Sequence, residues 1–212
     1  MVKLTPRLMA VANLVRKNSV LADVGCDHGY LPVYLLQNKI IVSAVASDIN
    51  SGPLKSCISL VESTGLGDKV KCVISNGLEN VNKDEYTDVS FCGMGGELIA
   101  ALLENVKCDF SKDKHYIFNP MTHPEILRKY LCENGFIIGA DIIVKEGKHY
   151  YNVFDAYYTG EKQAYDDVYY FLGNINDFTY KEYFTHILNH LENKEKGGSD
   201  YSAVIAAVKE KL

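Results

Sequence analysis

The stretch Leu21-Ala22-Asp23-Val24-Gly25-Cys26-Asp27-His28-Gly29-Tyr30 decides the fold of this chain. It begins as a short apolar run, which is typical of a buried strand, and it continues through a glycine-bearing turn into a helix-like segment that starts at Leu31. A strand, a glycine turn and a helix in this order form the nucleotide-binding corner of doubly wound α/β proteins. The sequence therefore predicts a cofactor site at residues 23–30.

The turn is acidic, which indicates the kind of cofactor. A dinucleotide-binding turn reads G-x-G-x-x-G, so that backbone N–H groups can approach a pyrophosphate. Here the glycines are Gly25 and Gly29, and Asp27 stands in place of the middle glycine. A carboxylate at that point repels a pyrophosphate but attracts the sulfonium and ammonium groups of S-adenosylmethionine, which carries no phosphate. We therefore predict S-adenosylmethionine rather than NAD as the cofactor.

Three further segments complete the predicted cofactor site. Asp48 follows Gly25 by 23 residues at the end of a second strand, where an acidic residue accepts hydrogen bonds from ribose hydroxyls. Asn76-Gly77 follows a third strand and could address the adenine edge, although it is also an ordinary turn dipeptide. Gly93-Met94-Gly95 follows a fourth strand, next to the first, and could equally be a helix-capping turn. The predicted cofactor-binding residues are Asp23, Gly25, Cys26, Asp27, His28, Gly29, Tyr30, Asp48, Ile49, Asn76, Gly77, Gly93, Met94 and Gly95.

The loop after the fourth strand also bears on the methyl acceptor. Enzymes that methylate exocyclic amines place Asn or Asp before Pro-Pro at this point, and Met94-Gly95-Gly96 lacks that polar group. Its absence suits a ring nitrogen whose lone pair lies in the plane of the ring. Asn119, at the end of a fifth strand, could face the cofactor or substrate. Arg128 on the following helix could contact phosphate or be solvated.

Basic residues concentrate near the N-terminus. The net charge of −5 excludes a uniformly basic nucleic-acid binder, so any such binding must use a local patch. No Asp or Glu precedes Asp23, whereas Lys3, Arg7, Arg16 and Lys17 do. We predict that Arg7 and Arg16 contact nucleic acid. A solvated helix face is the alternative explanation.

The order of predicted elements indicates an α/β fold. An amphipathic helix at about residues 5–17 precedes strands at 19–24, 42–47, 70–74, 88–92 and 116–118, with helices between them. This alternation predicts a mostly parallel sheet covered on both faces. Two strand-like runs at 136–144 and 150–158, joined by a short turn, predict a hairpin that adds one antiparallel strand. Such an ending is typical of Rossmann-like class I methyltransferases rather than dehydrogenases, by analogy of fold.

The pattern changes after Gly160. Apolar stripes at residues 180–191 and 201–212, separated by a polar turn at 193–198, predict an antiparallel pair of helices. The aromatic side chains between Tyr165 and Phe184 could stack on bases, but packing against the sheet domain is the favoured interpretation. We therefore predict a methyltransferase domain at residues 1–160 and a helical extension at residues 161–212.

Composition bounds the remaining possibilities. The six cysteines include no C-x-x-C pair and the histidines show no metal-ligand spacing, so no metal site is expected. The chain shows neither a secretion signal nor an apolar run long enough to span a membrane. We expect a monomer with reduced thiols in the cytoplasm.

The sequence resembles the bacterial tRNA (adenine-22) N1-methyltransferase family. The resemblance covers most of residues 4–160, and its loops at Asp23–Val33 and Gly93–Ile99 are specific in combination. The other matching segments are Leu4–Leu8, Asp48–Leu54, Gly77-Leu78, Ile117–Leu131, Asn134–Phe136 and Glu146–Lys148. The family has Gly-Ser-Asp-His-Ala-Tyr where this chain has Gly25–Tyr30, alanine at Cys92, and Gln-Pro-Asn at Asn119–Met121. The helical tail is also shorter in this chain.

The resemblance implies methyl transfer from S-adenosylmethionine to N1 of a tRNA adenine. Because N1 lies on the Watson–Crick edge, the base must leave its stack before reaction. The product is cationic, so a carboxylate near the ring would stabilise it. Asp27 is the candidate, supported by His28, and both are predicted as catalytic residues. The predicted substrate-binding residues are Arg7, Arg16, Met94, Gly95, Gly96 and Asn119.

Three alternatives remain open from the sequence. A methyltransferase acting on a small molecule or a protein would keep the same cofactor site. A non-catalytic module would bind S-adenosylmethionine and transfer nothing. An NAD-dependent oxidoreductase is disfavoured by Asp27, and a comparison of thermal shifts with the two cofactors would test it.

Overall fold

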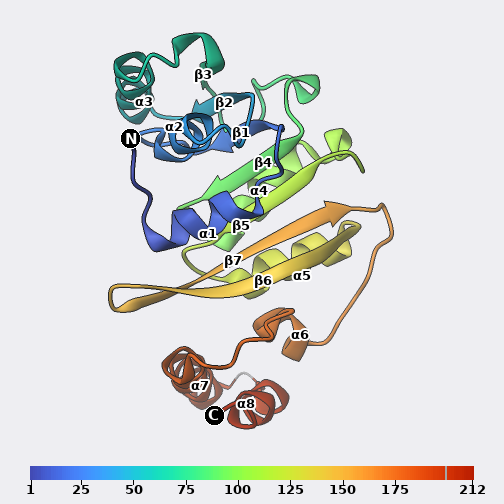
Figure 1. Cartoon of the computed structure of the whole chain (residues 1–212). Coiled ribbons are helices and arrows are strands. Elements are labelled where there is room, and N and C mark those ends of the chain that lie inside the picture. Colours follow the sequence, from blue (N-terminus) through green and yellow to red (C-terminus); the bar gives the residue numbers. More distant parts are fainter. Residues whose placement is uncertain (199) are drawn as a thin grey trace.

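A computed structural model of the chain describes residues 1–198 and 200–212. Seven strands and eight α-helices alternate through most of it (Figure 1). The strands are β1 (Val20–Val24), β2 (Ser43–Asp48), β3 (Val70–Ile74), β4 (Asp88–Cys92), β5 (His115–Asn119), β6 (Phe136–Glu146) and β7 (His149–Tyr158). The helices are α1 (Pro6–Leu14), α2 (Tyr30–Gln37), α3 (Ser51–Ser63), α4 (Gly96–Asn105), α5 (Pro124–Glu133), α6 (Asp167–Leu172), α7 (Lys181–Lys196) and α8 (Ser202–Lys209).

All seven strands form one sheet in the order β3-β2-β1-β4-β5-β7-β6. The pairs among β1 to β5 are parallel, whereas β7 is antiparallel to both β5 and β6. The strand order reverses between β1 and β4, which is the point at which open α/β sheets bind ligands. The predicted sheet, with one antiparallel strand from a C-terminal hairpin, is confirmed.

Helices cover both faces of the sheet, as Figure 1 shows. On one face, α1, α2 and α3 bury a cluster that includes Val11, Val33 and Leu54. On the other face, α4 and α5 bury a cluster that includes Ile99 and Leu127. Parallel strands need such cover on both sides, which explains why β1 is buried over nearly its whole length.

The C-terminal helices have a core of their own. α7 and α8 bury Phe184, Leu191 and Val208 in a third cluster, which Ile143 of β6 joins. Aromatic side chains of this segment pack on one another, as in the edge-to-face pair of Phe171 and Tyr201. The helical pair is as predicted, but the sequence did not predict α6. The domain boundary at residue 160 stays a prediction.

Two local predictions are wrong. The first helix ends at Leu14 rather than residue 17, because the backbone N–H of Arg16 donates to Asp88 at 2.8 Å and the chain turns there toward β1. Arg128 is fully buried, and its guanidinium donates to both carboxylate oxygens of Asp141 at 2.9 and 3.0 Å. Arg128 also donates to the carbonyl of Tyr170 in α6. It therefore ties the C-terminal helices to the sheet and is not available to phosphate.

Within residues 1–198 and 200–212, no helix is long and apolar enough to cross a membrane. The same residues contain no group of three or more His, Cys, Asp or Glu side chains that could hold a metal ion.

Candidate functional site

A cavity of about 520 Å³ opens at the carboxyl ends of β1, β2 and β4. Its position matches the reversal of strand order, where the loops after neighbouring strands separate. It lies within the size range of cofactor sites. The residues that line it are Arg7, Leu8, Asp23, Val24, Gly25, Cys26, Asp27, His28, Tyr30, Leu31, Asp48, Ile49, Asn50, Ser75, Asn76, Gly77, Cys92, Gly93, Met94, Leu98, Leu102 and Met121.

The loop after β1 forms one wall of this cavity. Gly25 and Gly29 have left-handed backbones, with φ of 69° and 72°, as does Asp27 with φ of 50°. Asp tolerates this conformation better than most residues, and glycine adopts it freely. The N–H groups of Gly25 and Cys26 both donate to the carbonyl of Ser47, which fixes the loop to β2. The sequence thus produces a tight, preformed turn.

Asp23 lies at the base of the cavity with one hydrogen-bond donor. It is only 4% exposed, and the Ser90 hydroxyl donates to its carboxylate at 2.7 Å. Burial raises the pKa of Asp23 to about 7; the Ser90 hydrogen bond opposes this shift, and the charge of Asp48 adds to it. The site therefore holds a carboxyl group that gains its charge near neutral pH, and a cation beside it would favour that charge.

Asp48 and Ile49 end β2 on the same cavity. The Asp48 carboxylate accepts the N–H of Asn50 at 2.8 Å and that of Asp27 at 3.4 Å. Ile49 is 62% exposed although it is apolar. A large exposed apolar side chain beside a fixed carboxylate suits a ligand that has a flat ring and hydroxyl groups.

The opposite wall comes from the loops after β3 and β4. Gly77 approaches Leu102 so closely that an added Cβ would lie 3.1 Å from its side chain. Gly25 likewise faces Met94, whose methyl group would lie 3.1 Å from a Cβ at that position. Glycines at these two positions keep the cavity open between the loop after β1 and the loop after β4. Asn76 also lines the cavity, and its side-chain nitrogen donates to Glu79 at 2.8 Å.

The predicted catalytic pair lies at the mouth of the cavity. The side chains of Asp27 and His28 are 69% and 49% exposed, and the Nε2 atom of His28 lies 3.6 Å from the Oδ1 atom of Asp27. The ring of His28 lies 5.6 Å from that of Tyr30. Exposure at the mouth makes both side chains accessible to an incoming substrate.

Arg7 reaches the cavity from α1. Its guanidinium donates to Asn119 at 3.2 Å and lies 3.4 Å from the Glu146 carboxylate. Asn119 itself is fully buried and donates to the carbonyl of Asn152. Asn119 therefore positions Arg7 and does not line the cavity.

The structure does not bring Arg16 to this cavity, and its contact with nucleic acid stays a prediction. Arg16 lies at the opposite edge of the sheet, where its Nε donates to Asp88 at 2.8 Å. It also donates to the carbonyls of Thr87 and Asp113. Three acceptors hold its guanidinium, so its charge stabilises the start of β4.

Three predicted glycines support the cavity without lining it. A Cβ on Gly29 would lie 2.4 Å from the sulfur of Cys57, and one on Gly96 would lie 2.2 Å from the carbonyl oxygen of His123. At Gly95 a Cβ would lie 2.9 Å from the Thr122 hydroxyl. These glycines allow the loops to pack closely on α3 and on the loop after β5.

Several residues that line the cavity lie outside the motifs that the sequence predicts. Ser75, Leu98, Leu102 and Met121 are separated from the predicted motifs by one to several residues. Leu98 and Met121 are 50% and 37% exposed although they are apolar. This exposure indicates a binding surface, but it can be seen only in the folded chain. The periodicity of α4 could have indicated Leu98, because it lies off the buried stripe formed by Ile99 and Leu103.

Comparisons with known proteins agree with this geometry. A family model described as a methyltransferase domain matches residues 4–154. The tRNA (adenine(22)-N(1))-methyltransferase of Bacillus subtilis is 33% identical over 166 residues, which cover 78% of this chain and 70% of that protein. The chain belongs to this methyltransferase family. The resemblance predicted from the sequence is thereby confirmed.

Solved structures extend the similarity to the whole chain. Streptococcus pneumoniae Sp1610, described as a putative tRNA (m1A22) methyltransferase in complex with S-adenosyl-L-methionine, has a TM-score of 0.89 at 28% identity and covers 99% of this chain and 100% of its own. TrmK of M. capricolum, in complex with S-adenosyl-homocysteine, has a TM-score of 0.79 at 27% identity, with coverage of 98% and 94%. The helical extension therefore belongs to the shared architecture of the family.

Proposed function

We propose that this chain transfers a methyl group from S-adenosylmethionine to N1 of an adenine in tRNA, with adenine 22 as the target. The observation that carries this proposal is the cavity in which Asp23, Asp27 and Asp48 meet, in a member of this methyltransferase family. Three carboxylates at one sheet edge favour a cationic adenosine derivative over a phosphate-bearing coenzyme.

The residues of the cavity fit S-adenosylmethionine. Bound there, the cofactor would supply a methyl group activated by its positively charged sulfur. Asp48 would accept hydrogen bonds from the ribose hydroxyls, and Ile49 and Leu102 would enclose the adenine beside Gly77. Asp23 would neutralise positive charge at the base of the cavity, where Ser90 donates to it and no Lys, Arg or His of the described residues forms an ion pair with it.

Asp27 and His28 would act on the acceptor base at the mouth. Methylation of N1 places positive charge on the adenine ring, and the carboxylate of Asp27 would stabilise that charge as it develops. His28, 3.6 Å away, would hold Asp27 in position. Met94 would offer a soft apolar contact to the ring. In this scheme the protein contributes mainly position and charge, because the methyl donor is already activated.

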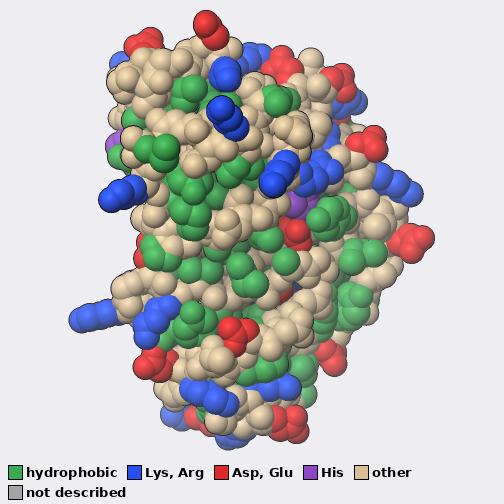
Figure 2. All heavy atoms as spheres, viewed as in Figure 1, with side chains coloured by type: hydrophobic (Ala, Val, Ile, Leu, Met, Phe, Trp, Pro, Cys, Tyr) green, Lys and Arg blue, Asp and Glu red, His purple; other side chains and the backbone are tan. Residues whose placement is uncertain are grey.

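Arg7 is the proposed contact to tRNA phosphate, and Arg16 is not part of this proposal. The face shown in Figure 2 carries Lys and Arg side chains in several separate groups, mixed with Asp and Glu. Positive charge alone therefore does not mark one path for tRNA on that face. A tRNA substrate also favours action in the cytoplasm, and we propose a monomer as the active form.

The experiment is incubation with labelled S-adenosylmethionine and unmodified tRNA, followed by mapping of the methylated base. We expect label at N1 of one adenine. We expect Asp27→Asn to lower kcat at saturating cofactor roughly 100-fold, beyond any loss of cofactor affinity that follows from removing one of the three carboxylates. Lys55→Gln, an exposed change on α3, is the matched control. Label in protein or metabolite extracts but not in tRNA would contradict the substrate, and cofactor binding without any transfer would indicate a non-catalytic module.

A further inference from the structure

A second cavity, of about 330 Å³, lies beside the first and has no part in the proposed chemistry so far. It is enclosed by the loop after β5, the start of α5, the strand β7 and the helix α7. Its lining residues are Pro120, Met121, Thr122, His123, Pro124, Glu125, Tyr150, Tyr151, Asn152, Phe171, Tyr183, His186, Ile187 and His190.

The chemistry of this second cavity suits an uncharged ring. Among the described residues that line it there is no Lys or Arg, and Glu125 adds a carboxylate, so a phosphate group would find no cation there. Burial and the nearby charge of Lys194 lower the pKa of His190, which keeps its imidazole neutral near pH 7. Tyrosine, phenylalanine and histidine rings provide stacking surfaces for a planar ligand.

One buried polar group in this cavity needs an acceptor. Asn152 is 4% exposed, and the hydroxyl of Tyr183 donates to its side-chain oxygen at 2.9 Å. Its side-chain nitrogen has no hydrogen-bond partner among the residues that the structure describes. Buried donors are nearly always paired, because desolvating an unpaired one is unfavourable. This nitrogen has no exposed surface in the free protein. Nucleobases carry ring nitrogens and carbonyl oxygens that would accept its hydrogen bond once the side-chain amide turns toward the cavity.

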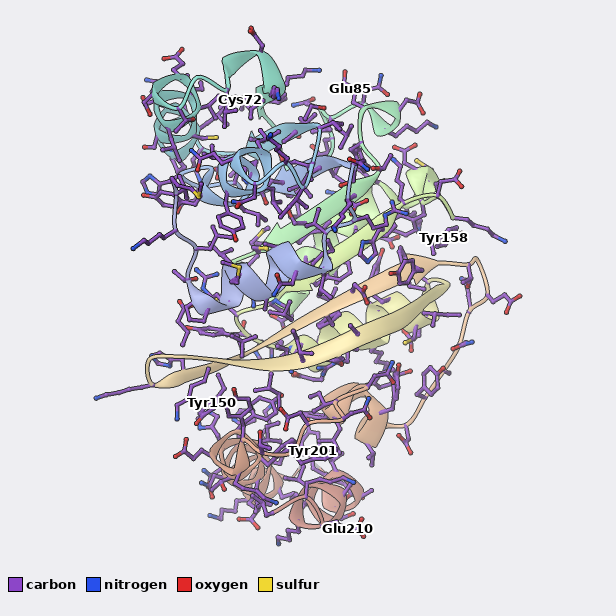
Figure 3. The ribbon with its side chains drawn as sticks, viewed as in Figure 1. Cys72, Glu85, Tyr150, Tyr158, Tyr201 and Glu210 are labelled. Atoms are coloured by element: carbon purple, nitrogen blue, oxygen red, sulfur yellow. The ribbon has the colours of Figure 1, made fainter. Side chains whose placement is uncertain are left out.

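The stacking surface is held rigidly. Tyr150 lies where the β6–β7 hairpin meets α7 (Figure 3), with its ring 5.6 Å from that of Tyr180 and 6.3 Å from that of Tyr183. Its hydroxyl donates to Glu182 of α7. An aromatic ring fixed in this way loses little freedom when a ligand stacks on it.

The two cavities share a wall. Met121 lines both of them, and its N–H donates to the carbonyl of Met94 at 2.8 Å. Asn119, two residues earlier, connects the same loop to Asn152. A ring held in the second cavity would therefore be separated from the methyl-transfer cavity by a single loop.

We propose that the second cavity takes the base of a nucleotide adjacent to the target adenine in tRNA. This inference rests on the proposed function, since it concerns the same RNA strand. When the target adenine leaves its stack, its neighbour loses a stacking partner, and a pocket with aromatic walls and an unpaired donor would compensate for that loss. The loop 119–123 would then separate two bases that are stacked in free tRNA.

The test fills the cavity from its exposed side. His186 lines the second cavity and is exposed on α7, so His186→Trp would fill the cavity without disturbing the protein core. Asn189→Trp is the matched control, because Asn189 is exposed on the same helix but does not line the cavity. We expect His186→Trp to lower kcat/KM for tRNA at least about fivefold, the lower range for a lost base stack. Affinity for S-adenosylmethionine should remain that of the wild type, and His190→Trp should reproduce the effect.

RNA with single abasic nucleotides on either side of the target adenine completes the test. One of these abasic substitutions should reduce kcat/KM of the wild type by a similar factor and should cause no further loss in His186→Trp. Two results would overturn this inference and leave the proposed function intact. One is equal activity of His186→Trp and Asn189→Trp, and the other is that both abasic substitutions reduce the activity of His186→Trp as much as they reduce that of wild type. A wild-type protein that methylates no tRNA adenine would instead overturn the proposed function, and this inference with it.

Discussion

Two buried carboxylates on neighbouring strands differ in their surroundings. Asp88 begins β4 at one edge of the sheet and is fully buried. It accepts from the Nε and backbone N–H of Arg16, each at 2.8 Å, and from His115 at 3.4 Å, and these partners lower its pKa. Asp23 lies toward the opposite edge with Ser90 as its donor, and its pKa is raised to about 7.

This difference in pairing indicates that one edge of the sheet contributes to stability and the other to ligand binding. At the amino edge, charges are paired, since His115 also bonds to Asp155 at 2.8 Å. At the carboxyl edge, Asp23 is buried without an ion-pair partner among the described residues, which is unfavourable in the free protein. A charge left in this state is typical of a binding site whose ligand supplies the missing partner. The comparison can be tested from both edges.

Asp88→Asn should have the largest effect, on stability. Removing this charge takes a shared partner from the partly exposed guanidinium of Arg16 and from the buried imidazole of His115, which should lower the free energy of unfolding by about 3 kcal/mol. Urea titration followed by circular dichroism measures this change. Asp113→Asn, an exposed change whose backbone carbonyl still accepts from Arg16, is the control. Affinity for S-adenosylmethionine should be the same in all three proteins, and a loss of affinity in Asp88→Asn would break the separation.

Asp23→Asn should act in the opposite direction on stability. The native pKa of Asp23 is raised above that of the unfolded chain, so its ionisation destabilises the free protein progressively from about pH 4 to pH 7. The substitution removes that cost and keeps an acceptor for Ser90. At pH 8 the free energy of unfolding of Asp23→Asn should exceed that of wild type by about 2 kcal/mol. This is less than the full pKa shift of Asp23 implies, because solvent that enters the cavity screens the carboxylate.

The gain should be small near pH 4, where the wild-type carboxyl is protonated in the folded protein and still about half protonated in the unfolded chain. Urea titrations at pH 4 and pH 8 on wild type and Asp23→Asn measure this difference. The same variant should bind S-adenosylmethionine more weakly, because it cannot neutralise the ligand. Equal stability of the two proteins at pH 8 would mean that Asp23 is not destabilising in the free protein.

The sequence predicts the carboxyl edge better than the amino edge. The loop containing Gly25 and Asp27 and the strand ending at Asp48 are local patterns, and the alternation of strands and helices implies that they meet. The pairing of Arg16 with Asp88 joins residues 72 positions apart and leaves no local pattern. The prediction that Arg16 acts together with Arg7 therefore rests on charge alone.

The same limit applies to Arg128 and to the second cavity. Arg128 stands on a helix with polar neighbours, but α6 and Asp141 bury it once the C-terminal segment folds over α5. Asn152 and His186 come from elements that contact each other only in the folded chain. Sequence patterns predict elements and their termini; they do not specify which side chains from distant elements share a space.

The smallest effect we predict is the pH dependence of cofactor affinity, which links the raised pKa of Asp23 to its role in binding. With a pKa of about 7, Asp23 is mostly protonated at pH 6 in the free protein, so a cationic ligand must displace its proton. The Kd for S-adenosylmethionine should therefore fall roughly tenfold between pH 6 and pH 8. Calorimetry over this range measures it, with Asp23→Asn, whose affinity should not vary in this way, as the control. S-adenosylhomocysteine keeps the ammonium group and lacks the sulfonium, so the same slope with both ligands would assign the recognised charge to the ammonium. A flat profile for wild type with both would show that Asp23 does not meet the ligand's charge, and its burial would then need another explanation.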